Sequence, residues 1–202
     1  MVQTVAVIPA RGGSKRLPRK NITELFGKPL IVWSIEACLA AGEIDAVYVS
    51  SDDARILDIA TDAGARTISR PAPLADDATP KIEAIRHAHE WLGREEQIEP
   101  EIIVSVQANS PEMSARDLDR AVARLKELGA WEVFSIDEND AMNGAIRALR
   151  THCLYNTFLS AHMAVIRANY IDVHTQSDLD AVKQRYGSLA AFEAAKSAGS
   201  NT

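Results

Sequence analysis

The strongest constraint on the fold is an alternation along the chain between short runs rich in β-branched residues and longer segments whose apolar residues recur at helical spacing. The runs predict buried strands, which we place at Val2–Pro9, Ala46–Ser51, Arg66–Ser69, Ile102–Gln107, Glu132–Ile136 and His162–Arg167. The helical spacing predicts helices over Pro29–Ala41, Asp53–Ala63, Ile82–Leu92, Leu118–Leu128 and Ser177–Tyr186. Such alternation is typical of parallel strands joined by crossover helices.

This pattern predicts a three-layer α/β/α architecture with a mostly parallel sheet. The length of 202 residues suits one domain, which we expect to span residues 1–196, with residues 197–202 as a flexible tail. Between the elements, Pro71–Asp77 and Asp137–Asn143 are expected to be loops. Sheets of this kind bind ligands at the carboxyl ends of their strands. The chemistry is therefore expected just after the strands that end at Pro9, Ser51, Gln107 and Ile136.

Composition and charge exclude several classes of protein. The net charge of −6 argues against a nucleic-acid-binding protein. The longest apolar stretch, Pro29–Ala41, is interrupted by Ser34 and Glu36, and no signal peptide is readable, so we expect a soluble, cytoplasmic protein without a membrane span. The two cysteines, Cys38 and Cys153, lack metal-ligand spacing and do not suggest a disulfide scaffold.

One segment carries an unusual concentration of positive charge. Residues 11–20 contain five of the 22 lysines and arginines and no acid, although the rest of the chain is strongly acidic. Two glycines, Gly12 and Gly13, allow backbone N–H groups to approach a ligand closely. The spacing matches neither the P-loop nor the dinucleotide fingerprint. We expect this segment, which we call the anion loop (residues 10–21), to bind a polyphosphate; the alternative is a mobile basic loop on the surface.

The anion loop and several later motifs resemble one enzyme family. Arg11-Gly12-Gly13-Ser14-Lys15-Arg16-Leu17-Pro18-Arg19-Lys20-Asn21, followed by Phe26-Gly27-Lys28-Pro29, is similar to the opening motif of the sugar-acid cytidylyltransferases, with features of both the acylneuraminate and the Kdo branches. Family segments are also similar, in the same order, to Ser50–Asp53, Arg70–Asp77, Gln107–Pro111, Asn143–Ile146 and Ile171–Thr175. The resemblance covers about residues 4–182 and implies the Rossmann-like nucleotidyltransferase (nucleotide-diphospho-sugar transferase) fold.

The resemblance implies a metal-dependent nucleotidyltransferase that condenses CTP with an acidic sugar or a similar small acid and releases pyrophosphate. It assigns Lys20 and Arg11 as catalytic residues, because cations must meet the charge that develops on the phosphates. It also assigns a set of nucleotide-binding residues: Arg11, Gly12, Gly13, Ser14, Lys15, Lys20, Asn21, Arg70 and Gln107. For Arg70 a solvated loop charge, and for Gln107 a role in capping the strand end, are the alternatives.

Two positions depart from the family pattern in a way that affects the metal. The family carries acids that bind Mg²⁺ near Asp172 and at the position of His174, and the Kdo branch has an acid where this chain has Asn109. Asp172 and His174 are the candidate metal ligands; for His174 the alternative is an ordinary residue at a strand end without a metal contact. Imidazole suits Mn²⁺ better than Mg²⁺, so either ion is a candidate cofactor.

The acceptor and the oligomeric state are less constrained by the sequence. The stretch before the Asn143–Ile146 motif is shorter than in the family, which favours a compact acid as acceptor, with Arg147 or Arg150 as its cation. It also puts the family's usual homodimer in question. Tyr155, Phe158 and Leu159 are either core residues or a dimer interface.

Two alternative functions remain open from the sequence. One is transfer of a nucleotide other than CMP to a sugar phosphate on the same fold. The other is a nucleotide-binding protein that has lost turnover, which the neutral or basic residues Asn109 and His174 suggest.

Overall fold

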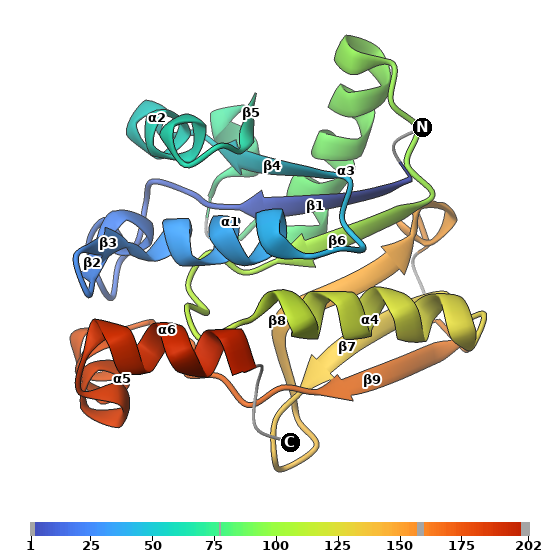
Figure 1. Ribbon diagram of the computed structural model, residues 1–202. Helices are drawn as coiled ribbons and strands as arrows, with labels where there is room; N and C mark the ends of the chain where they lie inside the picture. The colour runs from blue at the N-terminus through green and yellow to red at the C-terminus, as the bar shows by residue number, and fades with distance from the viewer. Residues whose placement is uncertain (1–2, 77, 157–159, 199–202) are drawn as a thin grey trace.

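A seven-stranded mixed sheet forms the centre of the computed structural model, which describes residues 3–76, 78–156 and 160–198 (Figure 1). The strand order is β5-β4-β1-β6-β8-β7-β9. The strands are β1 (Thr4–Pro9), β4 (Ala46–Ser51), β5 (Arg66–Ser69), β6 (Ile102–Val106), β7 (Glu132–Ile136), β8 (Met142–Arg150) and β9 (Met163–Arg167). All pairs are parallel except those of β8, which runs antiparallel to both β6 and β7.

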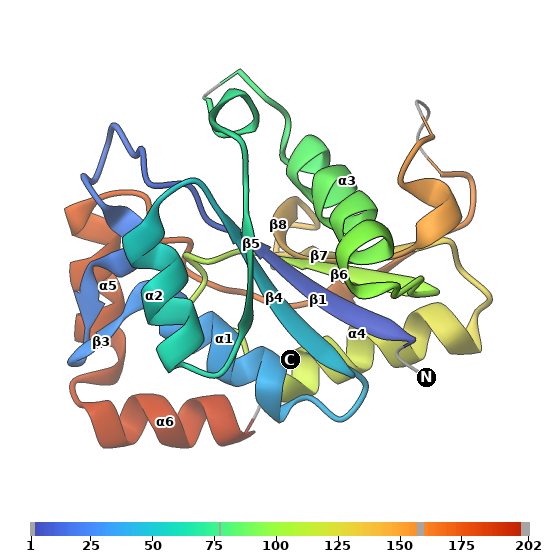
Figure 2. The same cartoon turned by 90° about the horizontal axis from the view of Figure 1, so that it is seen from above.

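Helices cover both faces of this sheet, which confirms the predicted three layers (Figure 2). The helices are α1 (Leu30–Ala40), α2 (Ala54–Asp62), α3 (Lys81–Trp91), α4 (Ala115–Glu127), α5 (Gln176–Tyr186) and α6 (Leu189–Ala198). Helix α3 packs on one face, over β1 and β6, whereas α1, α2 and α4 pack on the other. Each face has its own cluster of buried aliphatic side chains.

A third, smaller core joins α5 and α6 to the hairpin of β2 (Glu24–Leu25) and β3 (Lys28–Pro29). Trp33 at its centre is 1% exposed and packs edge-on against Phe192, with ring centroids 4.9 Å apart. The Trp33 indole N–H donates to the carbonyl of Leu25, 3.1 Å away. This core fixes the segment that follows the anion loop.

Helices α2, α4 and α5 begin after residues whose side chains cap them. Asp53 caps α2 by accepting from the N–H of Arg55 at 2.9 Å. Ser114 with Asp117, and Thr175 with Asp178, form reciprocal capping boxes at the starts of α4 and α5. These caps define where the loops at the carboxyl edge of the sheet end.

The structure corrects the sequence predictions in three places. Strand β8 lies where the sequence predicts a loop followed by a stretch without regular structure. Helix α6 extends to Ala198, two residues into the expected tail of residues 197–202, of which 199–202 lie outside the described residues. Leu128, expected on the buried face of α4, is 57% exposed because the helix ends at Glu127. The other predicted strands and helices are present with ends shifted by three residues or fewer.

Candidate active site

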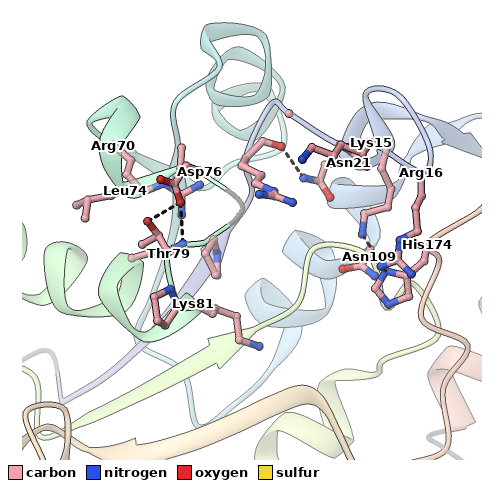
Figure 3. A pocket seen from close by; sticks show the side chains of 18 residues that line it. Lys15, Arg16, Asn21, Arg70, Leu74, Asp76, Thr79, Lys81, Asn109 and His174 are labelled. Atoms are coloured by element: carbon pink, nitrogen blue, oxygen red, sulfur yellow. Dashed lines mark hydrogen bonds between the residues drawn. The ribbon is translucent and has the colours of Figure 1, made fainter. Parts of the chain in front are cut away.

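A cavity of about 660 Å³ opens at the carboxyl edge of the sheet, where the strand topology predicts a ligand site. Its lining comes from the anion loop, the segment after β5, the start of α3 and the loops after β6 and before α5 (Figure 3). Six bases line it: Arg11, Lys15, Arg16, Lys20, Arg70 and Lys81. Among the described residues, one acid, Asp76, lines it with them. The cavity is therefore strongly electropositive and suits a polyanion.

Seven of the nine predicted nucleotide-binding residues line this cavity. They are Arg11, Gly13, Ser14, Lys15, Lys20, Asn21 and Arg70. The other two, Gly12 and Gln107, lie beside it. Arg16, Asp76, Thr79, Lys81 and Asn109 also line it, although the sequence analysis assigned none of them to the nucleotide.

Side chains and backbone contacts hold the anion loop in shape. The Asn21 amide nitrogen donates to the carbonyl of Arg11 at 3.0 Å, which bridges the two ends of the loop. The N–H of Gly12 donates to Asp52 Oδ1 at 3.0 Å, which ties the loop to the end of β4. Asn21 thus braces the loop as well as lining the cavity.

Gly12 is required by packing, because a Cβ built on it would lie 2.7 Å from the Cβ of Asp53. At Gly13 a Cβ would meet nothing within 4 Å. We expect Gly12→Ala to lower the free energy of unfolding by about 1–3 kcal/mol, the cost of overpacking, and Gly13→Ala to change it by less than about 0.5 kcal/mol. Urea denaturation of the two variants measures both. Equal stability would contradict this packing.

Lys20 is partly buried beside other cations of the cavity. Burial, with the Arg16 guanidinium nearby, lowers its pKa to about 8. Its Nζ lies 3.4 Å from His174 Nδ1, and Arg16 Nη2 lies 3.1 Å from the same nitrogen. Because both cations are donors only, the neutral imidazole accepts from them. An anion in the cavity would relieve the repulsion between these cations.

Arg70 follows β5 and is almost fully buried, which excludes the alternative of a solvated loop charge. Its Nε has no hydrogen-bond partner among the described residues. One Nη lies 3.9 Å from Asp52 Oδ1, and burial lowers the pKa of the guanidinium. A buried guanidinium with unused donors is suited to bind a polar ligand group.

Gln107 and Asp172 are linked by Ser110 at the carboxyl end of β6. The Ser110 hydroxyl lies 3.1 Å from Gln107 Oε1 and also contacts the Asp172 carboxylate. Burial raises the pKa of Asp172, although Lys81 and Lys20 oppose that shift. Asp172 therefore interacts electrostatically with both lysines.

The predicted metal ligands do not form a site that fits a divalent cation. Nδ1 of His174 faces two cations, and burial together with Lys20 and Arg16 lowers the pKa of its ring. Asn109, where the Kdo branch has an acid, donates its amide to the carbonyl of Val173 at 3.1 Å. Across residues 3–76, 78–156 and 160–198, no group of three His, Cys, Asp or Glu side chains is arranged to hold a metal ion. Asp172 offers a partly buried carboxylate in this region.

Comparison with known proteins is consistent with this geometry. The sequence model of the family described as Cytidylyltransferase matches residues 5–183. The chain belongs to the cytidylyltransferase family. It is 44% identical over 98 residues to a pseudaminic acid cytidylyltransferase of Campylobacter jejuni. This aligned region covers 48% of this chain and 42% of that protein. It is 29% identical to an N-acylneuraminate cytidylyltransferase of Escherichia coli, over 90% of this chain and 43% of that protein.

The solved structures support the fold. The structure of CMP:2-keto-3-deoxy-manno-octonic acid synthetase complexed with CTP matches with a TM-score of 0.75 and 17% identity, covering 92% of this chain and 98% of the other. At that identity the likeness concerns the fold. The aligned part of the chain spans less than half the length of the curated relatives described above. No helix in the described part of the chain is long and apolar enough to span a membrane.

Proposed function

We propose that this protein transfers CMP from CTP to a small acidic acceptor and releases pyrophosphate. The observation that carries the proposal is the electropositive cavity at the carboxyl edge of the sheet, which six bases line. Three of them, Arg11, Lys15 and Lys20, match the family's triphosphate positions by the sequence resemblance. Its family membership supports the use of CTP, and the names of the relatives support a sugar acid as acceptor.

The anion loop accounts for most of the proposed chemistry. The acceptor hydroxyl attacks the α-phosphorus and gives its proton to water, a new P–O bond forms, and the bond to pyrophosphate breaks in line with it. Arg11 and Lys15 hold the leaving pyrophosphate, whereas Lys20 meets the charge that develops at the α-phosphate. Because Lys20 already lies close to the charges of Arg16 and Arg11 before the ligand binds, little reorganisation is needed in the transition state.

The remaining predicted residues position the nucleotide. Gly13 and Ser14 present the loop backbone and a hydroxyl to the phosphates, and Gly12 keeps the loop close to Asp53. We assign Arg70 and Asn21 to the cytidine end, and Gln107 to the edge nearest the acceptor. In this proposal residues 1–196 form one nucleotidyltransferase domain.

A requirement for Mg²⁺ or Mn²⁺ stays a prediction from the family resemblance. The donor set of this chain does not fit a resident dication, because the His174 nitrogen already serves two cations.

The cellular location and the oligomeric state are also part of the proposal. Both cysteines are buried and unpaired, which is typical of a protein from a reducing compartment and supports a cytoplasmic location. A homodimer stays a prediction; Met163 and Val165 on the edge strand β9 are 44% and 40% exposed. Tyr155 is 49% exposed, whereas Phe158 and Leu159 lie outside the described residues.

Pyrophosphate release tests the proposed function. The purified protein is incubated with CTP and with N-acetylneuraminate, pseudaminic acid or 3-deoxy-manno-octulosonate, in Mg²⁺ and then in Mn²⁺. We expect release that requires both CTP and one of the acids. Release from another triphosphate with a sugar phosphate, or CTP binding without release in every mixture, would contradict the proposal.

The pKa of Lys20 predicts how CTP binding depends on pH. With a pKa of about 8 the ammonium is charged below that pH and neutral above it. The association constant for CTP should therefore fall as the pH rises through 8, by up to about tenfold per pH unit for one proton. Calorimetric titration between pH 7 and 9.5 measures this fall. The same titration of Lys20→Met should be nearly flat, and an equally steep fall in that variant would exclude Lys20 as its source.

A further inference from the structure

The acid group of the proposed acceptor needs a cation that the triphosphate does not use. The two bases predicted for this role are engaged elsewhere. Arg147 donates twice to Glu132 Oε2, at 3.0 and 2.6 Å, and Arg150 pairs with Glu101 near the opposite edge of the sheet. Neither lines the cavity. The cation for the acceptor must therefore come from another residue.

Lys81, the first residue of α3, does line the cavity. Its Nζ donates to the carbonyl of Gly144 at 3.0 Å. Among the described residues no carboxylate lies within ion-pair distance of it. The residue as a whole is exposed, and desolvation of its ammonium in the cavity lowers its pKa. A cation held by one carbonyl in such a place can gain a stronger partner.

A second donor converges on the same point. Gly144 has a φ of +69°, and a Cβ built on it would lie 3.2 Å from Gln107 Nε2 and 3.8 Å from Lys81 Nζ. The Gln107 oxygen is already oriented towards Ser110. The Lys81 ammonium and the Gln107 amide nitrogen thus both lie against Gly144, where a β-carbon would crowd the amide.

A side-chain network fixes Gly144 in that position. Asn143 donates to the carbonyl of Ala168 at 2.6 Å and accepts from the N–H of Ala145 at 3.1 Å. The Ser135 hydroxyl donates to Asn143 Oδ1 at 2.5 Å and accepts from the N–H of Ile146 at 3.0 Å. These bonds span the irregular pairing of β7 with β8. The backbone on both sides of Gly144 is therefore held in place, and with it the carbonyl that accepts from Lys81.

The place of Lys81 favours the acceptor over the nucleotide as its ligand. The anion loop and Lys81 lie on different sides of the cavity (Figure 3). The charges of Lys20 and Lys81 both act to lower the pKa of Asp172. In-line attack requires the acceptor oxygen opposite the leaving pyrophosphate. If the anion loop holds pyrophosphate, the acceptor approaches from the side of Lys81.

We propose that the Lys81 ammonium, assisted by the Gln107 amide above Gly144, binds the acid group of the acceptor and makes the site select acidic over neutral acceptors. This inference rests on the proposed function and assigns its specificity to a residue outside the anion loop. Losing a charge-assisted hydrogen bond typically costs about 10- to 100-fold in affinity. Lys81→Met should weaken acceptor binding by that factor.

The test measures binding without turnover. Thermal stabilisation by CTP alone, and by each of the three acids with saturating CMP, is recorded for the wild type, Lys81→Met and Lys81→Arg. Lys183→Met, which removes an exposed cation from α5, is the matched control. We expect CTP to stabilise Lys81→Met as it does the wild type, whereas about 10- to 100-fold more acid should be needed for the same stabilisation. Lys81→Arg should recover part of the acid binding that Lys81→Met loses.

The methyl ester of the same acid tests whether the charge is what Lys81 recognises. The wild type should prefer the acid to the ester about 10- to 100-fold, and Lys81→Met should reduce this preference to within about threefold. Unchanged acid binding in Lys81→Met, a loss of CTP stabilisation instead, or no stabilisation of the wild type by any of the acids would overturn the inference. If CTP does not stabilise the wild type, the proposed function itself is contradicted, whatever the Lys81 variants show.

Discussion

Replacing Lys20 by methionine is expected to lower kcat by about a thousandfold, the scale on which a single preorganised charge acts at a developing oxyanion. Methionine keeps most of the side-chain volume and removes only the ammonium. Folding stability should not fall, because the charge of Lys20 is desolvated and lies beside the Arg16 guanidinium. Pyrophosphate release under saturating CTP and acceptor measures the effect, and urea denaturation measures stability.

Arg19→Asn is the matched control for Lys20→Met. Arg19 neighbours Lys20 in the anion loop, is exposed and does not line the cavity. Its φ of 55° is left-handed, which asparagine tolerates. We expect a loss of less than about tenfold, from weaker long-range attraction of the nucleotide. Near-wild-type turnover in Lys20→Met, or equal losses in the two variants, would remove Lys20 from the chemistry.

Replacing Lys196 by methionine is expected to lower the free energy of unfolding by about 2–4 kcal/mol, since buried carbonyls then lose their donor. Lys196 on α6 donates to the carbonyls of Trp33, Pro111 and Met113 at 3.2, 2.7 and 2.7 Å. It thereby ties the last helix to α1 and to the loop before α4. Urea denaturation at pH 7 checks the size of the effect.

Lys126→Met provides the comparison for Lys196→Met. Lys126 forms an exposed ion pair with Glu43 at 2.6 Å, and such pairs contribute less than about 1 kcal/mol. If Lys196→Met is no more destabilising than Lys126→Met, the three carbonyl contacts do not hold α6 in place.

The sequence predicts most of the fold because most elements carry a strong local pattern. Strands such as β1 and β6 are rich in valine and isoleucine, and α4 has apolar residues at regular helical spacing. Strand β8 lacks this pattern, since Met142–Arg150 contains alanine, arginine, glycine and asparagine, which have low strand propensity. It is a strand because β6 and β7 pair with it on both sides.

The residues of the site likewise divide into those that a local sequence pattern predicts and those that it does not. The anion loop is readable because its cations and glycines are contiguous in the sequence, and seven of the nine predicted nucleotide residues line one cavity. Lys81 looks in sequence like an ordinary charged residue at the start of a helix. Its role depends on Gly144, 63 residues away, so no local signal reveals it. The environment of His174 likewise arises from Arg16 and Lys20, which are more than 150 residues away.

The most direct test of the central claim is thermal stabilisation by CTP, UTP, GTP and ATP, each alone, with Mg²⁺ and with Mn²⁺. A ligand at about a hundred times its Kd adds about 2.7 kcal/mol, which for a chain of this size raises Tm by roughly 5–10 °C. We predict a rise of this size with CTP and a clearly smaller one with the other three. Equal stabilisation by all four, or none by CTP, would contradict the assignment of the cavity to CTP.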